Sequence, residues 1–212
     1  MKKIILVGAG GHCKVIIDII KSTNQYEIVG ITDNNSKGSI LGIPIIGDDS
    51  ILQDIYNKDV KYAFTAIGAL KNIKIRNNIY MKLKEIGFKL PVLIHKKAMV
   101  SQFSSIKEGT CVMAGAIVNS DSSIEENCII NTGAVIEHDC NIGSNCHISP
   151  NTSIAGGVYI GFNTHIGIGS SVIEGIKIGN NVTIGAGAVV INDIKDDSLA
   201  VGIPAKIIKN KK

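Results

Sequence analysis

An unbroken hydrophobic repeat with a period of six residues runs through the second half of the chain. Seventeen successive positions of this repeat are occupied by Ile or Val. Neither a helix nor a flat sheet requires a strict period of six, whereas a solenoid of short strands places one inward β-branched residue in each hexapeptide. The repeat therefore predicts a parallel β-solenoid. Its members are Ile94, Val100, Ile106, Val112, Val118, Ile124, Ile130, Ile136, Ile142, Ile148, Ile154, Ile160, Ile166, Val172, Ile178, Ile184 and Val190.

A second register lies three residues after each Ile or Val and, from Gly109 to Asp193, contains only Gly, Asn or Asp. These residues adopt a positive φ at the lowest cost, so each hexapeptide is expected to turn a corner there. Two residues before the Ile or Val, small side chains such as Cys140 and Cys146 suit a tight inner corner. Three corners per coil predict a triangular prism with about 18 residues per turn.

Composition limits the classes of function that the chain can have. The length of 212 residues allows two small domains. The net charge is +4, but basic residues are sparse in the solenoid and commoner before Lys97 and after Lys195, which is not a stripe suited to nucleic acid. The first apolar run is too short for a signal peptide, and no segment is long enough to span a membrane. Five cysteines without an export signal predict a reduced, cytoplasmic chain, and their spacing does not suggest a metal site.

Residues 1–90 have the pattern of alternating strands and helices, ahead of a solenoid domain at residues 91–212. Such alternation predicts a parallel sheet with helical crossovers, that is, a small Rossmann-like α/β domain. The expected strands are 3–7, 26–32, 62–67 and 89–93, and the expected helices are 12–21, 50–56 and 72–86.

The first turn of this domain reads Gly8-Ala9-Gly10-Gly11-His12-Cys13, a partial dinucleotide fingerprint in which Cys13 replaces the third glycine. Glycines between a strand and a helix N-terminus let backbone N–H groups approach a phosphate. Asp33, at the end of the second strand, is placed to accept a hydrogen bond from a ribose hydroxyl. The simpler interpretation is that the glycines only form a tight turn and Asp33 only begins the next loop.

Three histidines of the solenoid lie outside the inward Ile/Val positions and are expected to project outward. His147 and His165 are 18 residues apart, which stacks them on successive coils about 5 Å apart. His138 and His147 are half a coil apart, so they lie on opposite sides of the prism and could meet only between two chains. His138 is flanked by Glu137 and Asp139, either of which could orient the imidazole of a general base.

The sequence resembles the hexapeptide-repeat acyltransferases and, within them, the NeuD/PglD-like sugar acetyltransferases. The resemblance rests on the Gly8–His12 turn, the segment Ile136-Glu137-His138-Asp139-Cys140 and the closing segment from Val201 to Lys206. It covers essentially the whole chain. It implies a left-handed parallel β-helix, an exception to the usual right-handed crossover, and a homotrimer that binds acetyl-CoA between subunits without a metal.

The resemblance also implies roles for individual residues. His138 would be the general base and Asp139 the acidic residue that tunes it, although relatives often have Glu there. His147, Ile168 and Ala186 would contact acetyl-CoA, His147 from the adjacent subunit. In the N-terminal domain, the residues implied to bind the nucleotide-sugar are Gly10, Gly11, His12, Asp33, Asn34 and Gly68. The resemblance assigns no role to His165.

Together these features favour acetyl transfer from acetyl-CoA to the 4-amino group of a nucleotide-linked deoxy-sugar in bacterial glycan synthesis. O-acetylation of a sialic acid or related sugar by the same machinery is the alternative. A non-catalytic scaffold that binds a nucleotide-sugar and a nucleotide-dependent oxidoreductase are the rivals from other classes. The oxidoreductase fits less well, because 90 residues leave little room for a second half-sheet.

Overall fold

The computed structural model describes residues 1–69 and 73–210, which form two compact units, Met1–Lys96 and Lys97–Lys212. The division falls a few residues after the expected boundary at residues 90–91. Two contacts account for the difference. His95 Nε2 lies 3.4 Å from the Asp18 carboxylate, and the Lys96 N–H donates to Ser22 Oγ at 3.3 Å, so this segment is held by the first helix.

The first unit is a sheet with the strand order β3-β4-β2-β1-β5. The central strand β1 runs parallel to both β2 and β5, so the crossovers depart from it in opposite directions. The strands are β1 (Lys2–Val7), β2 (Tyr26–Thr32), β3 (Ser39–Ile40), β4 (Ile43–Gly47) and β5 (Tyr62–Thr65). The helices are α1 (Gly11–Thr23), the 3-10 turn η1 (Asp49–Ile51), α2 (Leu52–Asn57) and α3 (Ile73–Ile86).

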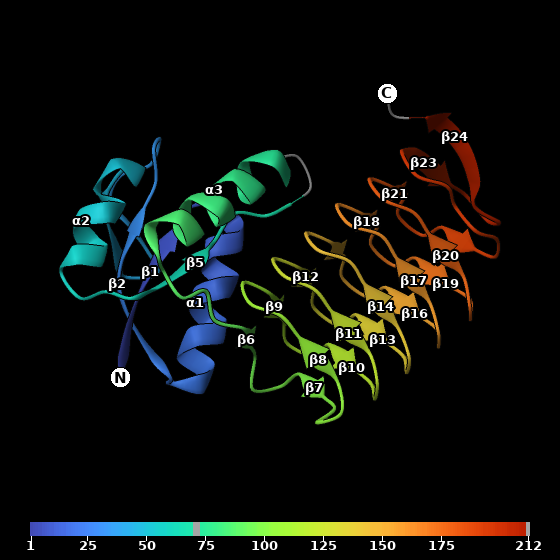
Figure 1. The fold of residues 1–212 in the computed structure, drawn as a ribbon, viewed down its shortest axis with the longest axis horizontal. Coiled ribbons are helices and arrows are strands. Elements are labelled where there is room, and N and C mark those ends of the chain that lie inside the picture. The colour runs from blue at the N-terminus through green and yellow to red at the C-terminus, as the bar shows by residue number, and fades with distance from the viewer. Residues whose placement is uncertain (70–72, 211–212) are drawn as a thin grey trace. The chain divides into compact units, whose positions relative to one another are not determined.

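Strand β1 is buried along both of its faces, because four consecutive apolar residues, Ile4 to Val7, are all shielded from solvent. This is the pattern of a central parallel strand covered by helices on both sides. On one face, Ile5 and Val7 share a hydrophobic cluster with residues of α2 and α3, two helices labelled in Figure 1. The members contributed by these two helices are Leu52, Ile55, Tyr80 and Leu83.

The predicted α/β alternation is confirmed, with differences at three places. The strand expected at 62–67 ends at Thr65, because the Arg76 guanidinium binds the carbonyls of Thr65 and Ile67 at 2.9 and 2.7 Å. The strand expected at 89–93 is wrong: Lys89 makes one isolated bridge to Tyr62, and β6 covers only Leu93–Ile94. The β3–β4 hairpin was not expected, and the predicted helix start at Asn72 lies outside the described residues.

The second unit is the predicted solenoid, with three faces of short parallel strands (Figure 1). The first face carries β7 (Met99–Val100), β10 (Ile117–Val118), β13 (Val135–Ile136), β16 (Ser153–Ile154), β19 (Ser171–Val172) and β22 (Val189–Val190). The second face carries β8 (Ser105–Ile106), β11 (Ser123–Ile124), β14 (Asn141–Ile142), β17 (Tyr159–Ile160) and β20 (Lys177–Ile178). The third face carries β9 (Cys111–Val112), β12 (Ile129–Ile130), β15 (His147–Ile148), β18 (His165–Ile166), β21 (Thr183–Ile184), β23 (Ser198–Val201) and, antiparallel to it, β24 (Lys206–Asn210).

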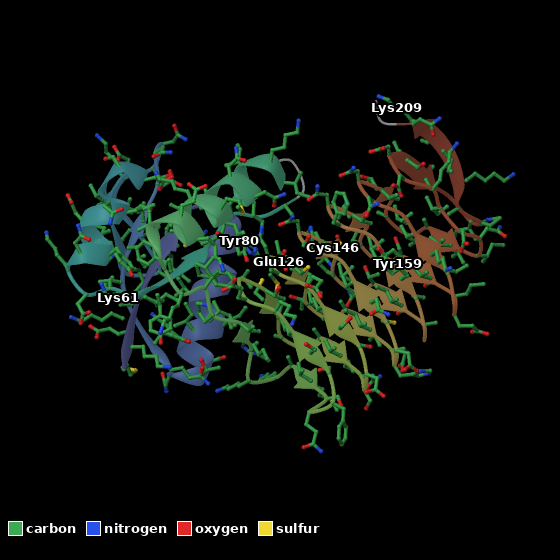
Figure 2. The ribbon with its side chains drawn as sticks, in the orientation of Figure 1. Lys61, Tyr80, Glu126, Cys146, Tyr159 and Lys209 are labelled. Carbon is green, nitrogen blue, oxygen red and sulfur yellow. The ribbon has the colours of Figure 1, made fainter. Side chains whose placement is uncertain are left out.

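The interior of the solenoid follows both sequence registers. Strands pair with a register of 18 residues, as in Val135 with Ser153, and every Ile or Val of the repeat from Val112 to Val190 is at most 3% exposed. The small residue Cys146 is buried inside the coil, whereas Tyr159 is 47% exposed; both are labelled in Figure 2. The described residues include no helix long and apolar enough to cross a membrane.

The corner prediction is confirmed at fourteen of the fifteen positions, from Gly109 to Gly187, which all have a positive φ. It is wrong at Asp193. There the side chain accepts a hydrogen bond from the Lys177 N–H at 2.8 Å, and the left-handed residue is Asp197, with a φ of 56°. Asp197 bonds Asn181 across 16 residues rather than 18, so the last coil is shorter than the others.

Candidate active site

The His138 imidazole lies at a corner of the solenoid, two residues after the end of β13, and its side chain is 65% exposed. Asp139 is the left-handed residue of this corner, with a φ of 60°. That conformation brings the Asp139 carboxylate back to the ring, where its Oδ2 lies 2.6 Å from His138 Nδ1. One residue therefore turns the chain and orients the histidine, so both functions expected for Asp139 coexist.

The charge around His138 favours its protonated form. The hydrogen bond with Asp139 is the largest cause that raises the pKa of His138 above its usual value, and the charges of Asp139 and Glu137 add to it. Glu137 is held by a hydrogen bond from Asn119 Nδ2 at 2.9 Å, one coil earlier. With Nδ1 bound to a carboxylate, the neutral ring carries its proton on Nδ1 and can accept a proton on Nε2.

Gly156 was missed in the sequence although it determines where the His138 ring lies. A Cβ built on Gly156 would stand 2.6 Å from Cε1 and 2.7 Å from Nε2 of His138. The imidazole therefore rests against the bare backbone of the next coil. The sequence did contain a signal for this contact: positions 138 and 156 are 18 residues apart, one coil, so a side chain at 156 would lie directly beside His138.

His147 lies on β15 of the third face and stacks on His165 of β18 as predicted, with the ring centroids 5.1 Å apart. His147 alternates with the inward Ile148 and so has the outward phase that was expected, but it is only 5% exposed, so the ring is covered. Asn131 Nδ2 contacts His147 Nε2 at 3.0 Å, and Ser149 Oγ contacts His165 Nε2 at 2.8 Å. Neighbouring coils thus hold both rings.

The two histidines implied in catalysis and acyl-donor binding occupy different sides of the prism. His138 lies at the corner between the faces of β13 and β14, whereas His147 lies on the third face, which is opposite to that corner. The half-coil separation read from the sequence is therefore present in the structure. Within one coil the two side chains do not form a common site.

Ile168 and Ala186 occupy equivalent positions in successive coils, at the corner that follows the third face. The Gly187 N–H donates to the Ile168 carbonyl at 2.8 Å, so the two coils are in close contact there. Ile168 is 53% exposed and Ala186 is exposed as well. Together they form an apolar edge that begins beside the face bearing His147, which suits an extended ligand lying along the coils.

A cavity of about 370 Å³ lies in the first unit, at the carboxyl ends of the parallel strands. This is the edge where open α/β sheets bind ligands, next to the strand from which the crossovers diverge. The cavity has a polar side and an apolar side. Its lining residues are Val7, Gly8, Asp33, Asn34, Asn35, Asp49, Ile67, Ile75 and Ile79.

Asp33 joins the glycine turn to the end of β2. Its Oδ2 accepts from the Ala9 N–H at 2.8 Å, and its Oδ1 accepts from the N–H groups of Asn35 and Ser36 at 2.9 and 2.7 Å. Burial alone would raise the pKa of Asp33, but these backbone donors lower it below its usual value. Asp33 therefore has a structural role as a charged acceptor of three backbone N–H groups, and it also lines the cavity. Its hydrogen bond to a ribose hydroxyl stays a prediction.

Asn34 is paired with Asp49, a residue that the sequence did not single out. The Asn34 amide donates to Asp49 Oδ2 at 3.3 Å and accepts from the Asp49 N–H at 3.1 Å, while Thr32 Oγ1 donates to Asp49 Oδ1 at 2.8 Å. Asp49 lies in η1, after the unexpected β3–β4 hairpin. Without knowledge of that hairpin, the sequence could not place Asp49 beside Asn34.

The glycines of the first turn differ in what the fold requires of them. Gly8 has a φ of 106° and lies against Ile67, so the fold itself requires glycine there. Gly10 and Gly11 have open space around the position of a Cβ, and Gly10 has an ordinary φ of −81°. Glycine at these two positions therefore leaves the backbone N–H groups at the start of α1 accessible to a ligand.

His12 lies in the first turn of α1 beside Gly68, since a Cβ built on Gly68 would stand 3.8 Å from the His12 Cβ. The structure thus brings together the implied substrate residues of the glycine turn and of the segment after β5. Cys13, in place of the third glycine, is buried; burial raises its pKa to about 11, and the Asp33 charge adds to the shift. A thiol with that pKa is protonated near neutral pH and is not a nucleophile.

The described residues contain no group of three or more His, Cys, Asp or Glu side chains placed to hold a metal ion. Residues 3–83 match the PglD N-terminal domain family, and residues 121–156 and 157–192 match the bacterial transferase hexapeptide family of six repeats. These matches cover the Rossmann-like unit and the central coils. They identify the solenoid as a left-handed β-helix of hexapeptide repeats.

Solved structures with high similarity cover nearly the whole chain. PerB from Caulobacter crescentus, solved in complex with CoA and GDP-perosamine, is 38% identical with a TM-score of 0.92, and the alignment covers 98% of this chain and 97% of PerB. The acetyltransferase domain of PglB from Neisseria gonorrhoeae is 36% identical with a TM-score of 0.93, over 98% of this chain and 100% of that domain. A further structure of that domain contains acetyl coenzyme A. The chain therefore belongs to the PglD/NeuD-like family of hexapeptide-repeat sugar acetyltransferases.

Proposed function

We propose that this chain transfers the acetyl group of acetyl-CoA to the 4-amino group of a nucleotide-linked deoxy-sugar, with His138 as the general base. The observation that carries the proposal is the exposed His138 ring. Its Nδ1 lies 2.6 Å from Asp139 Oδ2, and its Nε2 lies beside Gly156, which has no side chain to cover it. PerB, which shares 38% identity with this chain, was solved with CoA and GDP-perosamine. Such a histidine suits proton removal from an attacking amine.

The reaction follows from this arrangement. The sugar amine, in its neutral form, attacks the thioester carbonyl carbon, and His138 Nε2 takes the proton that the nitrogen loses as the C–N bond forms. Collapse of the tetrahedral intermediate then breaks the C–S bond. The sulfur leaves with the electron pair, and the protonated His138 returns the proton to it, giving CoA thiol and the amide. Asp139 holds the ring and stabilises its positive charge during the proton transfer.

The cavity of the first unit supports binding of the nucleotide part of the acceptor. The N–H groups at Gly10 and Gly11 begin a helix and suit a diphosphate. The cavity is lined both by polar residues, Asp33, Asn34 and Asp49, and by isoleucines, a combination suited to a nucleoside. GDP-perosamine, the ligand of the PerB structure, is the first acceptor to be tried.

The opposite placement of His138 and His147 supports a trimer in which each acetyl-CoA lies between the His138 corner of one subunit and the partner subunit's His147. Ile168 and Ala186 would contact the pantetheine and nucleotide end of the donor. All five cysteines are buried thiols, and the donor is a thioester of a thiol cofactor, so we propose that the reaction takes place in the cytoplasm. Light scattering should give a mass three times that of the chain, and a monomer would contradict the shared site.

The test is release of CoA thiol with a panel of acceptors, namely GDP-perosamine, UDP- and dTDP-linked 4-amino-sugars, and free sialic acid. Turnover with one 4-amino-sugar, reduced about 10²-fold or more in His138→Ala, is expected. Turnover with sialic acid alone would mean that the chain is an O-acetyltransferase, with the same base acting on a hydroxyl acceptor. Absence of both turnover and acetyl-CoA binding would favour a non-catalytic scaffold.

A further inference from the structure

Two carboxylates line the cavity of the first unit, and they differ in how their oxygens are used. Asp33 accepts three backbone N–H groups, two of them on Oδ1. Asp49 accepts one hydrogen bond on each oxygen, from Thr32 Oγ1 on Oδ1 at 2.8 Å and from Asn34 Nδ2 on Oδ2 at 3.3 Å. A carboxylate oxygen can accept two hydrogen bonds, so each oxygen of Asp49 can accept one more.

The amide of Asn34 is held in one orientation beside this carboxylate. The backbone N–H of Asp49 donates to Asn34 Oδ1 at 3.1 Å, and a backbone N–H can only donate, so the atom that it meets is the amide oxygen. The amino group therefore lies at Asp49 Oδ2, which uses one of its two hydrogens. The contacts give three groups in sequence: the second N–H of Asn34, then Asp49 Oδ2, then Asp49 Oδ1.

The Asp49 carboxylate is fixed before any ligand binds. Thr32, which donates to Oδ1, is fully buried at the end of β2. Asn34 binds both the side chain and the backbone of Asp49, and Lys82 Nζ donates to the Asp49 carbonyl at 2.8 Å. A carboxylate restrained in this way loses little conformational entropy when it binds a ligand, so its hydrogen bonds contribute to selectivity.

The same cavity offers apolar surface to a flat ring. Ile67, Ile75 and Ile79 line it, and Ile75 and Ile79 lie four residues apart on α3, hence on the same side of that helix. The described residues that line the cavity include no lysine or arginine. The cavity therefore suits an uncharged heterocycle with hydrogen-bond donors, and a diphosphate suits the accessible N–H groups at Gly10 and Gly11 instead.

We propose that Asn34 and Asp49 select guanine as the base of the nucleotide-sugar. The donor, acceptor, acceptor sequence of these side chains is complementary to the Watson–Crick edge of guanine, which presents the acceptor O6 followed by the donors N1–H and N2–H₂. Uracil and thymine have carbonyl oxygens on both sides of N3–H, so one oxygen of Asp49 would meet another acceptor. The inference rests on the proposed function for one point, that the acceptor carries a nucleotide.

The selectivity can be measured without any sugar. Calorimetric titration of the full chain with GDP, inosine diphosphate, UDP and dTDP compares four bases on the same diphosphate. GDP should bind about 10- to 100-fold more tightly than inosine diphosphate, which differs only by lacking the 2-amino group and leaves one carboxylate oxygen without its donor. UDP and dTDP should bind at least as weakly as inosine diphosphate.

A substitution that keeps the shape of Asp49 should change the preferred base. In Asp49→Asn the introduced amide can accept from N1–H and donate to a carbonyl at position 2, so the variant should prefer xanthosine diphosphate to GDP by about 10-fold or more. Asp48→Asn is the matched control. The adjacent Asp48 accepts from the Ser50 N–H at 2.8 Å, an amide oxygen keeps that bond, and the preference for GDP should be unchanged.

Four results would overturn the inference: equal affinity for GDP and inosine diphosphate, tighter binding of UDP or dTDP than of GDP, a base preference that changes in Asp48→Asn and not in Asp49→Asn, or binding of none of the diphosphates. The first two use only the wild-type protein, so they hold even where a variant fails to fold. Failure of the proposed function has a different signature, because selective binding of GDP would then persist without thiol release from acetyl-CoA.

Discussion

Replacement of Gly156 by alanine should impair catalysis without unfolding the protein. The added Cβ would lie 2.6 Å from His138 Cε1, whereas ordinary contacts to a Cβ begin at 3.4 Å, so the ring must move by about 0.8 Å. The backbone of the next coil is fixed by its hydrogen bonds, such as that from the Gly157 N–H to the His138 carbonyl at 2.9 Å. The exposed imidazole is therefore the group that moves.

The size of the effect follows from the geometry of the base. A displacement of about 0.8 Å stretches the 2.6 Å contact with Asp139 and moves Nε2 away from the reacting amine. Misplacement of a catalytic group by about 1 Å costs up to 10²-fold in rate, so kcat should fall by roughly 30- to 100-fold. The free energy of unfolding should change by less than about 0.5 kcal/mol, because a surface side chain can rotate into solvent.

The assay is thiol release from acetyl-CoA at saturating concentrations of both substrates, with thermal unfolding measured on the same samples. Gly115→Ala is the matched control. Its Cβ meets nothing closer than 3.9 Å, but its φ of 72° disfavours alanine by about 1 kcal/mol, so its stability should fall while kcat stays unchanged. An unimpaired Gly156→Ala variant would refute the argument that the position of the His138 ring depends on this glycine.

Three further changes test other parts of the structure. Asp139→Asn removes the main cause of the raised pKa of His138. The acid limb of the pH profile of kcat/KM reports deprotonation of this base, so it should move to lower pH, and the plateau value of kcat/KM should fall about 10-fold or more. Asp121, a corner residue with a φ of 58°, should lose about 1 kcal/mol of stability as Asp121→Ala and almost none as Asp121→Gly, measured by urea denaturation. Arg76→Met should lower the free energy of unfolding by about 2–4 kcal/mol in the same assay, because the carbonyls of Thr65 and Ile67 lose their buried donor. It should also raise the KM for the nucleotide-sugar.

Each of these changes has an outcome that would contradict its reasoning. An acid limb that stays in place or moves to higher pH in Asp139→Asn would mean that another group sets the pH dependence. Equal stability of the alanine and glycine variants at Asp121 would show that its left-handed conformation carries no strain. Full stability of Arg76→Met would mean that solvent or neighbouring groups satisfy the two carbonyls.

The sequence was sufficient for the architecture of the solenoid because every coil repeats the same local requirements. An inward β-branched residue and a residue tolerant of positive φ recur every six positions, and Ile136 with Asp139 illustrates the pair. Each coil contacts only its neighbours, so a register that is correct for one coil is correct for the next. The prediction therefore failed only at Asp193, where the coil is shortened and the repeat ends.

The details of the candidate site depended on contacts between residues that are distant in the chain. The spacing of His138 and His147 could be read from the sequence, and the 18-residue spacing of His138 and Gly156 was also available there. Asn131 and Asp49, in contrast, act through a side-chain contact with another coil and across a hairpin that leaves no periodic signal. Burial of His147, an outward residue by its phase, likewise could not be read from the repeat. Periodicity determines which way a side chain points; the tertiary structure alone determines what it meets there, because packing and hydrogen bonding are pairwise and non-local.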